Sequence, residues 1–168
     1  MGAPASTRRK RDDDGAVRVG LISDTHGTLR PEAVDALHDC ARPMSPACRI
    51  SAQVLEALRA LAPRVVAVRG NVDGDWAIGI PDRAEIDIAG RRLLLLHDLK
   101  QLRVDPRAGG FDAVIAGHSH QPHIERRDGV LYVNPGSAGP RRFRLPVAVA
   151  RLQVSASRLD AEIVELGV

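Results

Sequence analysis

The chain has 168 residues, which is enough for one domain with a substantial hydrophobic core. Its 24 lysines and arginines nearly balance its 21 aspartates and glutamates, so the formal net charge is only +3 and gives no reason to expect a nucleic-acid-binding stripe. Aromatic residues make up 2% of the sequence, so the stacking platforms of single-strand-binding proteins are not expected either. The composition therefore predicts no nucleic-acid partner.

Cysteine usage and hydropathy favour a cytoplasmic protein without a membrane segment. The two cysteines, Cys40 and Cys48, make no disulfide framework, and no apolar stretch reaches the roughly 18 residues that span a bilayer. Residues 1–16 carry a basic and an acidic cluster without the apolar core of a secretory signal, so we expect a disordered tail. Residues 17–168 are then one domain, and whether it forms a homo-oligomer stays open.

The first predicted element is a buried strand over residues 17–22, which ends just before Asp24 and His26. Chemistry in α/β folds gathers at the C-terminal ends of such strands. Because Gly27 allows an open turn, a carboxylate and an imidazole one residue apart can both face one cation. Taken alone, the pair also fits a helix-capping Asp24 with His26 as a surface neighbour.

Helical spacing of apolar residues predicts helices over 31–41 and 51–62, the second capped by Ser51. A buried strand is expected at 64–69, and Ala89 with Gly90 joins strands 84–88 and 91–96 as a hairpin. Further strands are predicted at 112–116, 121–126, 130–134, 147–154 and 158–165. The second half is therefore mostly β.

Four predicted strands end on residues that can bind a metal. These are Asp24 with His26, Asn71, His97, and His118 with His120. Neutral imidazoles with carboxylate and amide oxygens form a coherent donor set for Mn²⁺, Fe²⁺ or Zn²⁺. We therefore predict that these residues share a metal site.

The order of the motifs extends this prediction. D-T-H-G at Asp24, G-N-V-D at Gly70, the strand-end His97, G-H-S-H at Gly117 and N-P-G-S at Asn134 follow one another along the chain. In this the chain resembles the calcineurin-like metallophosphoesterase superfamily, and most closely its small YfcE-type phosphodiesterase branch. The resemblance covers residues 17 to about 166. It implies an α/β fold in which two mixed β-sheets pack face to face, flanked by helices, as a four-layer αββα sandwich.

The same resemblance implies a binuclear metal centre that hydrolyses small phosphoesters. Asp24, His26 and His120 would bind one divalent cation, and Asn71, His97 and His118 the other. Catalytic roles would fall to Asp24, Asn71 and His97. Mn²⁺ is the expected metal, with Zn²⁺, Fe²⁺ or Ni²⁺ as alternatives. Larger relatives place a His after the Asn, and Val72 stands there instead, which favours diesters with stabilised leaving groups.

Residues 39–50 depart from the family pattern. No H-x-G-D motif supplies the Asp that would bridge the metals, and Cys48 stands roughly in its place. With two prolines, the segment is predicted to be a poor central strand. Either a genuine change of this segment or a pair of compensating frameshifts in the coding sequence would explain the departure. The departure keeps an alternative function open, a catalytically impaired member that acts as a binding scaffold.

Four charged residues near the motifs have two interpretations each. Asp98 either hydrogen-bonds an imidazole or is solvated. Arg141, Arg142 and Arg144 either clamp an anionic substrate or are ordinary surface residues. Asn134, Gly136 and Ser137 are expected to shape a tight turn beneath the site.

Overall fold

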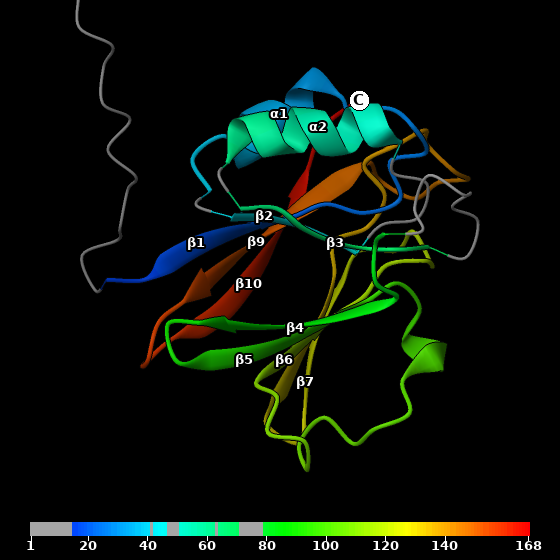
Figure 1. The fold of residues 1–168 in the computed structure, drawn as a ribbon. Coiled ribbons are helices and arrows are strands. Elements are labelled where there is room, and N and C mark those ends of the chain that lie inside the picture. Colours follow the sequence, from blue (N-terminus) through cyan, green and yellow to red (C-terminus); the bar gives the residue numbers. More distant parts are fainter. Residues whose placement is uncertain (1–14, 41, 47–50, 63, 71–78) are drawn as a thin grey trace, which may run out of the picture.

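Two five-stranded sheets pack against each other in the computed structural model, which describes residues 15–40, 42–46, 51–62, 64–70 and 79–168 (Figure 1). The first sheet has the order β10-β9-β1-β2-β3. Its strands are β1 (Val17–Leu21), β2 (Arg42–Pro46), β3 (Val66–Val68), β9 (Ala148–Val154) and β10 (Leu159–Glu165). Parallel pairing of β1 with β2 and of β2 with β3 is combined with antiparallel pairing of β1 with β9 and of β9 with β10.

The second sheet has the order β4-β5-β6-β8-β7 and is also mixed. Its strands are β4 (Arg83–Ile88), β5 (Arg91–Leu96), β6 (Ala113–Ile115), β7 (His123–Arg127) and β8 (Val130–Asn134). Ala89 and Gly90 join β4 to β5 with φ angles of 49° and 80°, the left-handed turn that the predicted hairpin requires. The predicted pair of mixed sheets is therefore confirmed.

Alternation along the strands divides the apolar side chains between layers. Val19 and Leu21 of β1 pack with Leu93 and Leu95 of β5 in the core between the sheets. On the outer side of the second sheet, Leu94 packs in a separate small cluster. Because successive side chains of a strand point to opposite faces, one strand serves both layers.

Both α-helices cover the outer face of the first sheet (Figure 1). They are α1 (Pro31–Leu37) and α2 (Ala52–Leu61), and α2 begins after the predicted cap, where the Val54 amide donates to Ser51 Oγ at 3.2 Å. A 3₁₀ helix, η2 (Leu99–Gln101), follows β5 of the second sheet. Within the described ranges, no helix is both long and apolar enough to cross a bilayer.

One prediction about the fold is wrong. Residues 42–46 do not avoid the sheet but form β2, a central strand between β1 and β3, despite Pro43 and Pro46. Each proline removes only one backbone N–H from the ladder, and two parallel neighbours offer partners to the remaining groups. Tertiary pairing thus outweighs a poor local propensity. The predicted tail falls mainly on residues 1–14, which lie outside the described residues, so it stays a prediction.

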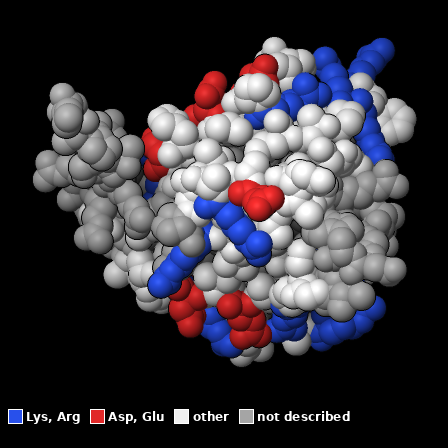
Figure 2. Space-filling view, turned by 45° about the horizontal axis from the view of Figure 1, so that its top comes forward, with Lys and Arg blue, Asp and Glu red and all other residues white. Residues whose placement is uncertain are grey.

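The surface carries mixed charge. Figure 2 shows acidic and basic side chains interspersed on one face of the molecule. This distribution agrees with the near balance of charges in the sequence.

Candidate metal centre

Five of the six predicted ligands meet at one end of the sandwich. Asp24 and His26 follow β1, His97 follows β5, and His118 and His120 follow β6. Because β5 and β6 are parallel, their C-terminal ends lie together, and the Gly117 amide donates to the His97 carbonyl at 2.9 Å. The sixth predicted ligand, Asn71, lies outside the described residues.

Asp24 is fully buried, and its two carboxylate oxygens have different surroundings. Ser23 Oγ donates to Oδ2 at 2.8 Å, and the His118 amide donates to the same oxygen at 3.1 Å. Among the described residues, Oδ1 has no hydrogen-bond donor, and it lies 3.5 Å from His120 Nε2. Burial raises the pKa of Asp24 to about 6, although the Ser23 hydroxyl and the His118 amide oppose the shift. A buried carboxylate oxygen without a donor is a fitting ligand for a cation.

The four histidines form two close pairs. His26 Nε2 lies 3.4 Å from His120 Nε2, and His97 Nε2 lies 3.2 Å from His118 Nδ1. Burial lowers the pKa of His97 and of His120 to about 4, and nearby positive charge lowers both further, chiefly from His118 and Arg142 respectively. Both imidazoles are therefore neutral at neutral pH, the state in which histidine binds metals.

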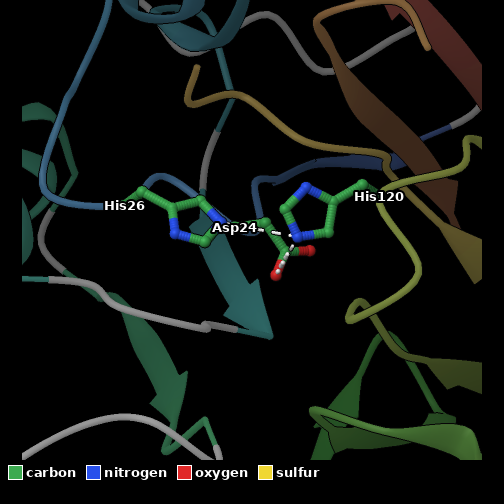
Figure 3. A group of neighbouring side chains, drawn as sticks. All are labelled: Asp24, His26 and His120. Atoms are coloured by element: carbon green, nitrogen blue, oxygen red, sulfur yellow. Dashed lines mark hydrogen bonds and ion pairs between the residues drawn. The ribbon is translucent and has the colours of Figure 1, made fainter. Parts of the chain in front are cut away.

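Figure 3 shows the side chains of Asp24, His26 and His120 pointing toward one another. One ligand atom from each of the three lies within 4.8 Å of the others. Nitrogen and carboxylate oxygen at this spacing suit a divalent transition metal. The interpretation of Asp24 as a mere helix cap therefore has no support, since the Asp24 side chain faces the histidines.

The backbone is strained at four of these five residues. Asp24, His26, His118 and His120 have φ angles of 54°, 50°, 74° and 62°. Left-handed backbone is uncommon outside glycine and costs about 1–3 kcal/mol at each residue. In both D-x-H and H-x-H the two strained residues are separated by one ordinary residue. Such strain clusters at functional sites, where the surrounding structure enforces it.

Glycines allow the close packing behind the ligands. A Cβ atom on Gly117 would lie 2.0 Å from Ser23 Oγ and 2.9 Å from Asp24 Oδ2. One on Gly139 would lie 2.6 Å from the Asp24 carbonyl oxygen and 2.5 Å from that of Thr25. The glycine of G-H-S-H thus makes room for the carboxylate of the D-T-H-G motif.

The N-P-G-S motif supports the site from below, as predicted. Asn134 Nδ2 donates to the Gly117 carbonyl at 3.2 Å and to Ser119 Oγ at 2.9 Å, and Asn134 Oδ1 accepts from the Gly136 amide at 2.9 Å. Ser137 Oγ donates to the Asp24 carbonyl at 3.0 Å. These bonds hold the two ligand-bearing turns in place.

Asp98 lies beside the centre and marks the edge of a cavity. Its Oδ2 is 3.8 Å from His118 Nε2, too long for a hydrogen bond, and its Oδ1 accepts from the Lys100 amide at 3.0 Å. The cavity has a volume of about 770 Å³, and the residues that line it include His118, Asp98, Lys100, Val114 and Tyr132. Sequence reasoning missed this space because its walls come from separate strands.

Comparisons with known proteins agree with the fold and the motifs. The model of the calcineurin-like phosphoesterase superfamily domain matches residues 17–157. A probable metallophosphoesterase of Methanothermobacter thermautotrophicus is 36% identical over 161 residues, which cover 89% of this chain and 92% of the relative. Phosphodiesterase YfcE of Escherichia coli is 32% identical over 110 residues, covering 61% of this chain and 60% of YfcE.

Among solved structures, Vps29 from Entamoeba histolytica, in a single-mutant form, has a TM-score of 0.72. The two are 20% identical, and the match covers 89% of this chain and 99% of Vps29, so this likeness shows the shared fold. The family model and the relative from Methanothermobacter thermautotrophicus each span most of the sequence. The chain therefore belongs to the calcineurin-like phosphoesterase superfamily.

Proposed function

We propose that the chain is a metal-dependent phosphodiesterase that hydrolyses small phosphoesters at a binuclear centre. The observation that carries this proposal is the convergence of one buried carboxylate and two close histidine pairs at the ends of β1, β5 and β6. The names of two relatives, a probable metallophosphoesterase and a phosphodiesterase, support it.

The donor set fits two divalent cations. Asp24, His26 and His120 would hold one, and His97 and His118 would hold the other together with Asn71, which lies outside the described residues. Mn²⁺ is the first choice for such mixed nitrogen and oxygen donors, and Zn²⁺, Fe²⁺ or Ni²⁺ are the alternatives. When bound, the cations supply Lewis-acid stabilisation of phosphate charge and a nucleophile at neutral pH.

The chain's own residues prepare and orient this site. The Ser23 hydroxyl and the His118 amide fix one oxygen of Asp24, which leaves the other free to bind. Low pKa values keep His97 and His120 unprotonated at neutral pH. We assign catalytic roles to Asp24, Asn71 and His97. The cavity beside His118 offers room for one ester group of the substrate.

The proposed preference is for diesters with good leaving groups. Val72 follows Asn71, so no imidazole stands at that position to protonate a departing alcohol. Activated diesters such as bis-p-nitrophenyl phosphate need little of this help.

Metal content and turnover, measured on one sample, test the proposal. The full chain is loaded with Mn²⁺, its metal content is determined, and hydrolysis of bis-p-nitrophenyl phosphate is compared with hydrolysis of p-nitrophenyl phosphate. We expect bound metal and faster hydrolysis of the diester. His120→Ala should lower metal content and rate, whereas His38→Ala serves as control because His38 is an exposed residue next to α1.

Three outcomes would contradict the proposal in different ways. Negligible metal content, or content unchanged in His120→Ala, would show that the ligands are misassigned. A strong preference for the monoester would overturn the substrate class. Normal metal content without any turnover would favour the alternative of a binding scaffold.

A further inference from the structure

The segment after the N-P-G-S motif packs against the turn that carries Asp24. The Ala138 amide donates to the Ser23 carbonyl at 3.0 Å, and Arg30 Nε and Nη2 both donate to the Gly139 carbonyl at 3.2 Å. Gly139 packs directly on the backbone of Asp24. Arg142 follows Gly139 by three residues. The basic residues of 141–144 therefore continue directly from a segment that packs on the backbone of the candidate metal ligand Asp24.

Arg142 begins a tight turn with an unusual residue at its tip. The Leu145 amide donates to the Arg142 carbonyl at 3.1 Å, and Phe143 next to Arg142 has a φ angle of 53°. Glycine is the usual residue for a turn with this backbone, and a bulky side chain there is a true outlier. A sequence selected only to close the turn would not place phenylalanine at this position.

The Phe143 side chain stands in solvent. It is 94% exposed, whereas Phe111 is buried beneath the Arg92 guanidinium and Tyr132 is partly buried beside Arg127. Among the aromatic residues in the described part of the chain, Phe143 is the most exposed. Both the left-handed backbone at Phe143 and the exposure of its apolar ring are unfavourable for folding, and residues kept at such a cost point to a binding role.

Three arginines flank Phe143 in the sequence. Arg141, Arg142 and Arg144 are all exposed, and within the ranges that the structure describes none of them forms an ion pair or a side-chain hydrogen bond. Free arginines bind phosphate oxygens through paired N–H donors. An aromatic face beside them adds a platform on which a flat ring can stack.

We propose that residues 141–144 are a recognition arm for a phosphodiester that carries a nucleoside. Phe143 stacks on the base, and the arginines hold the anionic groups near the metal centre. This inference rests on the proposed phosphodiesterase function and narrows its substrate class to small nucleotide esters. It also revises the sequence-based expectation that stacking platforms are missing, because R-R-F-R places one aromatic residue among basic ones.

The test compares two esters that share one leaving group, thymidine 5′-(p-nitrophenyl phosphate) and methyl p-nitrophenyl phosphate. The Mn²⁺-loaded full chain should have the higher kcat/KM for the thymidine ester. In Phe143→Ala, the ratio of the two kcat/KM values should fall about tenfold, mainly through KM, because stacking is lost. Phe143→Tyr should retain the ratio, and Val104→Ala, which shortens another exposed apolar residue, is the matched control.

A binding measurement decides the inference without turnover. Saturation transfer to the base protons of thymidine 5′-monophosphate should be seen with the original chain and with Phe143→Tyr, and lost with Phe143→Ala. If both esters are hydrolysed and Phe143→Ala changes neither their ratio nor the transfer, the recognition arm is refuted while the phosphodiesterase function stands. If neither ester is hydrolysed, the proposed function fails, and saturation transfer to thymidine 5′-monophosphate still tests whether the recognition arm binds a nucleoside. A change from dimer to monomer in Phe143→Ala, without loss of transfer, would make the ring a contact between copies and overturn the inference.

Discussion

Replacement of Asp24 by asparagine should stabilise the metal-free protein at pH 8. The Asp24 carboxyl is fully buried, and its pKa is raised from 3.8 to about 6, so its charged form is unfavourable in the fold. A shift of this size corresponds to about 3 kcal/mol at any pH above the folded pKa. Asparagine removes the charge and with it most of this penalty.

The local geometry accommodates the amide. Asparagine Oδ1 can take the place of the oxygen that accepts from Ser23 Oγ and from the His118 amide. Its Nδ2 then occupies the site of the oxygen that has no donor, 3.5 Å from His120 Nε2, which can accept a hydrogen bond. Asp24→Asn therefore keeps both existing hydrogen bonds and adds a donor where the carboxylate has none.

The pH dependence gives the sign of the effect. Because the folded pKa of Asp24 lies above the ordinary value, the penalty is absent below pH 3.8, grows as the pH rises and is complete above pH 6. The stability of Asp24→Asn relative to the original chain should thus be near zero at pH 4 and largest at pH 8.

Thermal unfolding in EDTA, followed by circular dichroism, measures this difference. For a chain of this size, about 3 kcal/mol raises Tm by about 6–12 °C. Added Mn²⁺ should then raise the Tm of the original chain but leave that of Asp24→Asn nearly unchanged, because the charged ligand is gone. A lower Tm for Asp24→Asn at pH 8 in EDTA, or an undiminished response to Mn²⁺, would refute the assignment of Asp24 as a buried metal ligand.

Three further changes test other parts of the site. Gly117→Ala should weaken metal retention and lower the free energy of unfolding by about 1–3 kcal/mol, because the added Cβ would lie 2.0 Å from Ser23 Oγ. Gly79→Ala is the control: its Cβ would meet open space, so neither metal retention nor the free energy of unfolding should change. In the Asp24→Asn background, the free energy of unfolding measured with urea should fall as the pH drops from 6.5 to 4. His97 and His120 have lowered pKa values in the fold, so over this range they take up protons more readily in the unfolded chain. A free energy of unfolding that does not change with pH would contradict these pKa values. Position 48 lies outside the described residues, and Cys48→Asp should raise the metal content that survives dialysis, since a carboxylate between two cations offsets their charge. Unchanged metal content would show that position 48 is not where a bridging carboxylate belongs.

Much of the fold was predictable because its causes are local. The cap at Ser51 and the turn at Ala89 and Gly90 depend on residues within one or two turns of chain, and both are found where predicted. The positions of the candidate ligands His97 and His118 were predictable because apolar patterns place these residues at the ends of strands. Periodicity is sufficient to locate such positions.

What could not be predicted depends on partners far apart in the sequence. β2 forms because β1 and β3 pair with it on both sides, and its two prolines conceal this from a local pattern. The pairing of His26 with His120 depends on how the two sheets pack, which spacing along the chain does not determine. The exposure of Phe143 was missed for the same reason, since composition says how many aromatic residues exist and not where their rings point.

Several unfavourable features of the chain lie together at one junction between the sheets. Asp24 Oδ1 and the Nδ1 atoms of His97 and His120 are buried without hydrogen-bond partners among the described residues, and four left-handed residues, Asp24, His26, His118 and His120, lie in the same place. Because the candidate ligands come from both sheets, a bound cation would link the sheets there and couple metal binding to folding. Amide hydrogen exchange should therefore slow with Mn²⁺ at residues 23–27, 117–120 and 137–139, and change little at the remote turn 155–157 between β9 and β10. Equal slowing at both ends of the sandwich would indicate general stabilisation instead, and no slowing near Asp24 would contradict a cation that joins the two sheets.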